Sequence, residues 1–137
     1  MAENSSIRRG RHAVWDLHTH LVFVTKYRHK VFTREHLEYL NDVFAGVCVD
    51  FGCELEQFNG EGEYVHLLVS FPATVELSKL VNSLKGVSSR RLRKKFPEVT
   101  QHYWNANVLW SRSYYAGTTG GAGIETVKRY IEAQTAP

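Results

Sequence analysis

Hydrophobic and polar positions along this chain follow a pattern that predicts four strands and three helices. A β-branched, apolar run over residues 18–26 predicts a largely buried strand. Residues 54–59 and 64–71 have the composition of two further strands, and the Gly-Glu-Gly sequence at 60–62 predicts a tight hairpin turn between them. A last strand region is predicted over residues 108–115.

Helical spacing of apolar residues separates these strands. Apolar side chains recur at helical intervals through residues 37–47, and Thr33 is the predicted N-cap of that helix. A second helix is predicted from Thr74, as N-cap, toward Leu92. The third helix covers residues 124–134.

The order β-α-β-β-α-β with an added helix predicts an α+β, ferredoxin-like fold, an antiparallel sheet with helices on one face. In that topology the first and third strands are central neighbours. The glycine-rich residues 117–123 predict a flexible hinge before the C-terminal helix. We expect residues 1–12 to form a flexible basic arm and residues 13–137 to form one domain.

Composition narrows the class of protein. The chain has 137 residues, of which 43% are hydrophobic and 23% charged, as in ordinary globular domains. No apolar run approaches the ~20 residues that span a bilayer, and the polar N-terminus does not resemble a signal peptide. Cys48 and Cys53 fit no zinc-binding spacing. We therefore expect a cytoplasmic protein with reduced thiols and no membrane partner.

Positive charge is unevenly distributed. The net charge is only +3, but cations crowd the end of the second predicted helix and the N-terminal arm. Such clusters favour a polyanionic partner, although a solvated charged face is the common alternative. The positions predicted to contact DNA are Arg8, Arg9, Arg11, Lys26, Arg28, Lys85, Arg90, Arg91, Arg93 and Lys94.

Two distant segments hold the candidate chemistry. Tyr64 and His66 lie on one face of a predicted strand because side chains alternate with a period of two. Tyr130 and Gln134 lie one turn apart on the predicted C-terminal helix. A histidine facing this pair could form a metal site beside a tyrosine nucleophile. From the spacing alone, a half-buried aromatic and a surface amide are the favoured explanation of Tyr130 and Gln134.

Five sequence strings in a fixed order resemble one family, the single-tyrosine HUH transposases of small bacterial insertion sequences, often called TnpA. They cover residues 20–28, 84–91, 109–111, 120–123 and 128–134, so the resemblance extends over nearly the whole chain. The family's defining motif is His-hydrophobic-His on a strand. Here the aligned string is Glu-Tyr-Val-His, with Tyr64 in the place of the first histidine.

The resemblance implies metal-dependent cutting and rejoining of single-stranded DNA through a 5′-phosphotyrosine intermediate. By position, Tyr130 would be the nucleophile, and His66 and Gln134 would hold Mg²⁺ or Mn²⁺. The implied partners are DNA hairpins at the element's ends and a second copy of the chain in a homodimer. Phosphate activation by a metal suits a phenol, which is a weak nucleophile at neutral pH.

Tyr64 decides between two hypotheses. A neutral imidazole binds metal at pH 7, whereas a phenol must ionise or act as a poor donor. The first hypothesis is a transposase impaired at its metal site, and the second is a non-catalytic nucleic-acid-binding relative. A third, an unrelated ferredoxin-like RNA-binding domain, predicts an RNP-like aromatic string that the sequence lacks.

Several other residues have two interpretations. His18 and His20 form an intact His-x-His string, but the resemblance assigns it to the first strand, outside the metal motif. Because the first strand neighbours the third in the predicted sheet, the alternative that one of these two histidines lies near the metal site stays open. Trp104 and Trp110 suit stacking on unpaired bases, with core or dimer packing favoured. The histidines at 12, 29, 36 and 102 are expected at the surface.

Overall fold

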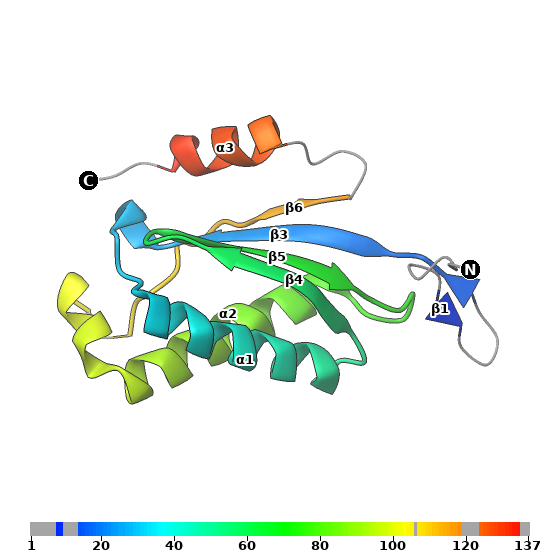
Figure 1. Ribbon diagram of the computed structural model, residues 1–137, viewed down its shortest axis with the longest axis horizontal. Helices are drawn as coiled ribbons and strands as arrows, with labels where there is room; N and C mark the ends of the chain where they lie inside the picture. The colour runs from blue at the N-terminus through cyan, green and yellow to red at the C-terminus, as the bar shows by residue number, and fades with distance from the viewer. Residues whose placement is uncertain (1–7, 10–13, 106, 119–123, 135–137) are drawn as a thin grey trace.

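The fold is a four-stranded antiparallel sheet with two helices on one face and a third helix over the other (Figure 1). The computed structural model describes residues 8–9, 14–105, 107–118 and 124–134. The sheet order is β4-β5-β3-β6, so the first and third predicted strands are the central pair, as expected. The strands are β3 (His18–Val24), β4 (Glu54–Gly60), β5 (Tyr64–Ser70) and β6 (Tyr115–Gly117).

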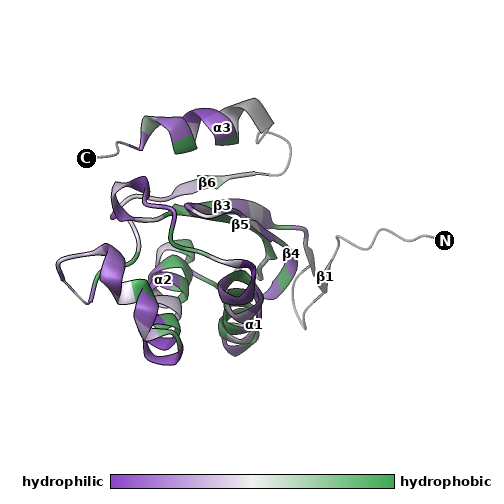
Figure 2. Ribbon diagram, turned by 60° about the vertical axis from the view of Figure 1, so that its left-hand side comes forward, coloured by the Kyte–Doolittle hydropathy of each residue, from purple (hydrophilic) through white to green (hydrophobic). Residues whose placement is uncertain are grey.

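The helices divide between the two faces of the sheet. Helices α1 (Arg34–Asp50) and α2 (Leu77–Lys95) lie together on one face, and α3 (Ile124–Ala133) lies on the other side, next to β6 (Figures 1 and 2). Short 3₁₀ turns, η1 (Lys26–Arg28) and η2 (Pro97–His102), follow β3 and α2. The predicted α+β, ferredoxin-like class with a C-terminal helix is confirmed.

The core lies between the sheet and α1 and α2. Phe23 and Leu67 point inward from the two central strands and are fully buried. They pack in one cluster with Phe44 of α1 and Leu84 of α2. Both helices present mixed hydrophobic and hydrophilic segments (Figure 2), as amphipathic helices do. The opposite, outer face of the central strands is therefore available for α3 and for polar chemistry.

The start of α1 is a capping box. Thr33 is the N-cap, as predicted, and its hydroxyl accepts a hydrogen bond from the backbone N–H of His36. In return the His36 ring accepts from the backbone N–H of Thr33, and its other nitrogen contacts Glu98 at 3.0 Å. His36 is only 3% exposed, so its expected surface position is wrong. The position three residues after the N-cap is usually Glu or Gln in a capping box, and here it is His36.

Two elements have other bounds than the sequence predicts. Helix α2 begins at Leu77 with Glu76 as its N-cap, because the backbone at Thr74 belongs to a turn in which Val75 donates to the carbonyl of Pro72. The last strand is shorter than 108–115 and covers Tyr115–Gly117, with an isolated bridge between Thr25 and Trp110. The carbonyls of residues 111–113 face a lysine instead of a neighbouring strand.

Two short strands pair near the N-terminus. Strand β1 (Arg8–Arg9) lies in the predicted arm, and it pairs with β2 (Val14–Trp15), which follows the arm. Arg11 and residues 119–123 of the predicted hinge lie outside the described residues. In the part of the chain that the structure describes, no helix is long and apolar enough to cross a membrane.

Candidate active site

Tyr130 and Gln134 of the C-terminal segment meet a loop that presents two serine hydroxyls. The Tyr130 hydroxyl lies 2.8 Å from Ser113 Oγ. The Gln134 side-chain oxygen accepts hydrogen bonds from Ser113 and Ser111, each at 3.2 Å. Either hydroxyl can be the donor in the contact between Tyr130 and Ser113. The one-turn spacing thus brings both side chains onto one loop.

This loop, residues 111–113, is called the serine loop, and Lys85 of α2 holds it in place. Its ammonium group donates to the carbonyl oxygens of Ser111, Arg112 and Ser113 at 2.7, 3.2 and 3.3 Å. Burial lowers the pKa of Lys85 below its ordinary value. Lys85 was predicted to contact DNA phosphates, and here all three of its N–H donors are directed at the protein's own backbone. Its role in this structure is to shape the loop that contacts Tyr130.

Arg28 contacts the same C-terminal end of α3, on its backbone. Its guanidinium donates to the carbonyl oxygens of Ile131 and Glu132, each at 3.3 Å. These are carbonyls of the last turn of α3, where a cation is favourable because the helix dipole is negative there. Arg28, also predicted to bind DNA, thus fixes the helix of Tyr130. The ring of Tyr115 in β6 adds a contact, 5.9 Å from the ring of Tyr130.

His66 lies on the outer face of β5, two strands from β6. In the sheet register Val22 of β3 is paired with His66 on one side and with Tyr115 on the other. Paired residues in an antiparallel sheet share a face, so His66 and Tyr115, with its neighbour Tyr130, lie on the same side. Val22 is fully buried and forms an apolar floor between them. Two strand spacings put the β5 and β6 backbones about 10 Å apart.

The other two predicted residues, Tyr64 and Gln134, are placed by Val24, which lies two residues after Val22 in β3. Val24 is paired with Tyr64 on one side, and its carbonyl accepts from the backbone N–H of Ser111 on the other. The Gln134 side-chain oxygen accepts a hydrogen bond from the Ser111 hydroxyl. All four residues named from the sequence, at positions 64, 66, 130 and 134, are therefore on the outer face of the sheet around two buried valines.

His20 is the residue that sequence reasoning set aside. Its Nδ1 lies 2.8 Å from His66 Nε2, and the two rings are nearly parallel, with centroids 4.9 Å apart. Burial lowers the pKa of His20. Burial, and then repulsion from His20, lowers the pKa of His66. Both imidazoles are therefore neutral at pH 7. The open alternative, that one histidine of the first strand approaches the site, is what the structure shows.

Tyr64 does not offer an equivalent ligand. Burial raises the pKa of its phenol above the ordinary value, and the carboxylates of Glu61 and Glu63 raise it further. The phenol thus stays protonated at neutral pH and is a weak donor atom for a metal. The Gln134 oxygen is already engaged by two serines. Among the described residues no group of three or more His, Cys, Asp or Glu side chains could hold a metal ion.

Tyr130 is a neutral phenol in this environment. Burial raises its pKa, and the hydrogen bond with Ser113 offsets part of that rise. The site therefore orients the phenol oxygen but does not ionise it at neutral pH. Activation has to come from outside the described hydrogen bonds.

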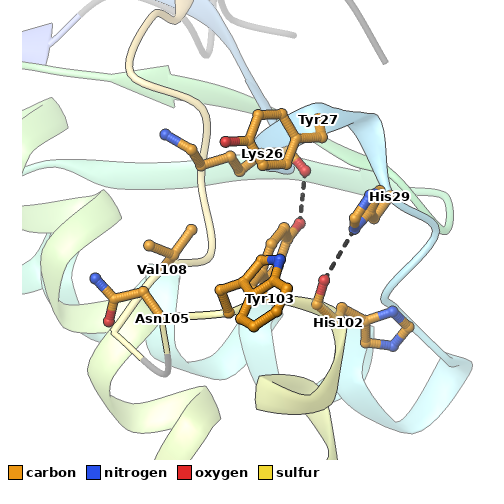
Figure 3. Close-up of a pocket in the computed structure, with 8 residues that line it drawn as sticks. Lys26, Tyr27, His29, His102, Tyr103, Asn105 and Val108 are labelled. Atoms are coloured by element: carbon orange, nitrogen blue, oxygen red, sulfur yellow. Dashed lines mark hydrogen bonds between the residues drawn. The ribbon is translucent and has the colours of Figure 1, made fainter. Parts of the chain in front are cut away.

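Two recesses adjoin these residues. The first has a volume of about 240 Å³ and is lined by Lys26, Tyr27, Ser111, Gln134 and their neighbours. The second has a volume of about 450 Å³ and is mostly aromatic (Figure 3). Lys26 and Tyr27 line both, so the two recesses adjoin. No sequence motif marked the second one, because its rings come from residues more than seventy positions apart.

The remaining predicted DNA contacts lie on and beyond α2. Arg90, Arg91 and Lys94 are exposed, and Arg93 donates to Ser89 and Asn107. Arg90, Arg93 and Lys94 line a further recess of about 560 Å³. The side chains at positions 8, 9 and 11 lie outside the described residues.

The two tryptophans have opposite environments. Trp110 is 9% exposed, belongs to the core and donates to Ser88 Oγ at 3.0 Å. Trp104 is fully exposed at the edge of the aromatic recess. Packing thus explains Trp110, as favoured from the sequence, but not Trp104.

The family and the relatives that this chain matches are all described as transposases. The family described as "Transposase IS200 like" matches residues 13–134. The ISDra2 transposase TnpA of Deinococcus radiodurans is 31% identical over 128 residues, covering 93% of this chain and 91% of the relative. The transposase for insertion sequence element IS200 of Salmonella typhimurium is 27% identical over 123 residues, covering 90% and 80%.

Solved structures agree with these relatives. A crystal structure of a candidate transposase from Deinococcus radiodurans R1 has a TM-score of 0.88 at 34% identity, covering 95% of this chain and 99% of that one. A REP-associated tyrosine transposase bound to a REP hairpin has a TM-score of 0.53 at 11% identity, covering 91% and 68%. The second likeness concerns the fold alone.

Proposed function

This chain belongs to the family of IS200-like transposases, and on that premise we propose that it binds hairpin ends of single-stranded DNA and cuts and rejoins strands through Tyr130. The observation that carries the proposal is the pair of hydrogen bonds that hold Tyr130 and Gln134 on the serine loop. A tyrosine fixed on the outer face of a sheet, opposite a neutral histidine, is an arrangement suited to phosphoryl transfer.

The proposed reaction exchanges one phosphodiester for another, because one P–O bond forms as one breaks. The Tyr130 oxygen attacks the scissile phosphorus, an O–P bond to tyrosine forms, and the bond from phosphorus to the 3′ oxygen breaks. The 3′ oxygen leaves as a hydroxyl after taking up a proton, and the phenol proton passes to solvent. Rejoining reverses the step, because a 3′ hydroxyl attacks the phosphotyrosine and returns the phenol. No external energy source is needed.

Ser113 orients the phenol in this scheme. The hydrogen-bond chain from Tyr130 through Ser113 ends at the Gln134 amide oxygen, which is not a base. Ser113 therefore aims the phenol oxygen and does not take up its proton. Because Tyr130 is neutral at pH 7, we expect the rate of covalent attachment to rise with pH above neutrality.

The divalent cation implied by the resemblance, Mg²⁺ or Mn²⁺, would polarise the phosphate oxygens when bound. The donor chemistry of the described residues fits such an ion at His66 and His20, two neutral imidazoles on one face. Tyr64 does not fit, because its phenol stays protonated. His20 is thus the residue that we propose beside His66 in place of the missing first histidine.

Hairpin DNA and a second copy of the chain are the proposed partners. A REP-associated tyrosine transposase of the same fold has been solved with a REP hairpin bound, and the exposed cations of α2 suit a phosphate backbone. Tyr130 is bonded to Ser113 of its own chain here. A homodimer stays a prediction from the family resemblance, to be measured by light scattering in solution.

One experiment separates the proposal from its alternative. The protein is incubated with labelled hairpin-bearing single strands from the DNA that flanks its gene, with Mg²⁺ or Mn²⁺, and run on a denaturing gel. A covalent adduct that Tyr130→Phe abolishes supports strand transfer. Hairpin binding without an adduct supports the non-catalytic relative, which the protonated Tyr64 favours. Absence of hairpin binding overturns both.

A further inference from the structure

The aromatic recess beside the active site has a chemistry that the fold does not require. It is about 450 Å³ in volume, larger than a nucleobase, and is open to solvent on one side. Its lining residues come from η1 and its flanks and from the segment after α2; those that matter below are Lys26, Tyr27, His29, Tyr103 and Trp104. Figure 3 shows Tyr27 and Lys26 on one side of the recess and Tyr103 across from them.

The rings of the recess are held in fixed positions. His29 and Tyr103 are stacked with centroids 5.1 Å apart and planes only 11° from parallel. The Tyr103 hydroxyl donates to the carbonyl of Lys26 at 2.8 Å, and a His29 ring nitrogen contacts the carbonyl of His102 at 3.1 Å (Figure 3). Burial raises the pKa of Tyr103 to about 12, so its ring stays neutral.

Two aromatic side chains of the recess are exposed at a cost. Trp104 is fully exposed and Tyr27 is 47% exposed. Burying rings of this size would stabilise the fold, and the free protein forgoes that stabilisation. Trp110, only six residues from Trp104, is buried in the core. Exposed aromatic residues at a recess are typical of a surface that binds a ligand.

The backbone of η1 is strained in a way that maintains this exposure. Tyr27 has φ 61° and ψ 13°, and Arg28 has φ 56°, both in the left-handed region that residues with side chains rarely adopt. The turn is fixed by hydrogen bonds from the N–H of Arg28 to Thr25 and from the N–H of His29 to Lys26. Such backbone strain is found most often at functional sites.

The recess is continuous with the active site and with the cations of α2. Lys26 and Tyr27 also line the recess that contains Gln134 and Ser111. Lys26 lines a third recess of about 390 Å³, together with Asn107. Asn107 in turn lines the recess of Arg90, Arg93 and Lys94. Four adjoining recesses therefore run from exposed α2 cations, past the serine loop, to the aromatic rings.

We propose that the aromatic recess binds one unpaired base of the single-stranded DNA next to the phosphate that Tyr130 attacks. The base stacks on Trp104 and Tyr27, and its backbone phosphates follow Lys26 toward the cations of α2. Every base has an aromatic face, so the recess accepts different bases. This inference rests on the proposed function, because it names how the DNA strand of that reaction is held.

An abasic scan tests the proposal. The probe is a DNA hairpin with single-stranded flanks from the DNA that borders the gene, in a series with one base removed at each flank position. We expect one position at which removal weakens binding by roughly 5- to 150-fold, the equivalent of the ~1–3 kcal/mol of one base–aromatic stack. A scan with no sensitive position overturns the proposal.

Protein variants complete the test. Trp104→Ala removes a fully exposed ring, and Tyr27→Asn removes a ring while keeping a residue that tolerates the left-handed region. Each should weaken binding of the intact probe and abolish the penalty at the sensitive position. Trp15→Ala, at a tryptophan that does not line the recess, is the matched control and should keep the penalty. If the penalty persists in both recess variants, the base is bound elsewhere and the proposal is wrong.

Two further arms separate this inference from the proposed function. If the wild-type protein binds neither the hairpin nor its flanks, the proposed function fails and this inference fails with it. If the hairpin stem binds normally and only the abasic scan is flat, the recess proposal alone fails. An RNA copy of the probe that binds more tightly than the DNA would overturn the assignment to DNA.

Discussion

The two halves of the candidate site are built with different rigidity. Tyr130 and Gln134 share a loop whose carbonyls are held by Lys85, and Arg28 holds the end of their helix. Across the apolar floor, His66 has one side-chain hydrogen-bond partner among the described contacts, His20. Tyr130, the proposed nucleophile, is therefore fixed by several independent elements, whereas the histidine side depends on one pair of rings.

This difference explains how the chain can lack the first histidine of the motif and keep the rest of the site. Tyr64 is paired with Val24, while Tyr130 is held by Ser113 on the far side of β3. A change at position 64 thus alters the histidine half and leaves the nucleophile half intact. The predictions that follow test this division.

Replacing Lys85 should have the largest effect. Lys85→Met keeps the length of the side chain but leaves three loop carbonyls without their donor. We expect a loss of about 1.5–3 kcal/mol in unfolding free energy, as for hydrogen bonds to a charged group. Covalent attachment of DNA should fall about 10²-fold because the nucleophile is misplaced. Urea unfolding and adduct gels measure the two effects.

The control for Lys85 is Lys79→Met on the same helix. Lys79 is exposed and pairs only with the exposed Glu76, at 3.6 Å, so its loss should change neither quantity measurably. If Lys85→Met attaches DNA at the wild-type rate, the serine loop does not position Tyr130.

Changing Tyr64 should act on the other half alone. Tyr64→His supplies an imidazole two residues before His66, on the same face of β5. We expect Mn²⁺ affinity, measured by electron paramagnetic resonance, to rise by at least about tenfold, the low end of what one supporting group changes at a metal site. The rate of adduct formation should rise with it.

Two variants sharpen the Tyr64 result. Tyr64→Phe should match the wild type in Mn²⁺ affinity, because a protonated phenol is not a ligand. His20→Ala in the wild-type background should reduce Mn²⁺ affinity if His20 stands beside His66 at the ion. Unchanged affinity in His20→Ala would assign the His20–His66 contact a structural role only.

Most of the fold follows from the sequence, because its signals are local. The two central strands, Thr33 as N-cap and the spacing of Tyr130 and Gln134 each depend on residues a few positions apart. The strand predicted at 108–115 was misplaced, because β6 covers Tyr115–Gly117 and shares only residue 115 with it. In the structure Lys85, more than twenty residues away, takes up the carbonyls that would have paired.

The sequence named residues that the structure brings to one face of the sheet, but it did not show which side chains hold them there. The motif named Tyr130, Gln134 and His66, while His20 was placed outside because a string of letters does not show which diagonal neighbours meet across two strands. Ser113 and Lys85 contribute through contacts that no local pattern encodes. The aromatic recess joins residues 26–29 with residues 102–108 and has no sequence signature.

A smaller effect is expected at the serine hydroxyls. Ser113→Ala removes the hydrogen-bond partner of the Tyr130 hydroxyl, whereas Ser111→Ala removes a group that contacts only Gln134 of the pair. We expect adduct formation to fall about fivefold in Ser113→Ala, the equivalent of one neutral hydrogen bond of ~1 kcal/mol. Ser111→Ala should fall by less. Equal losses in both would mean that Gln134, and not the phenol, is what the loop positions.

The smallest effect concerns the pH dependence of stability and probes the histidine pair without DNA or metal. Because the pKa values of His20 and His66 are lowered in the folded chain, the unfolded chain binds more protons just below the ordinary histidine value of about 6.5. Stability from this pair is thus fully present above that pH and declines as the pH falls through the lowered values.

With a chelator present, the wild-type melting temperature should therefore drop more between pH 7 and pH 5 than that of His20→Phe, which loses one partly buried imidazole and the repulsion on its neighbour. His102→Phe, at an exposed histidine, should keep the wild-type drop. Parallel curves for wild type and His20→Phe would show that the histidine half is solvated and loosely held, and that His20 does not shape it. A shallower curve in His20→Phe would instead mean that the pair is coupled, and that His66 depends on its neighbour as Tyr130 depends on the serine loop.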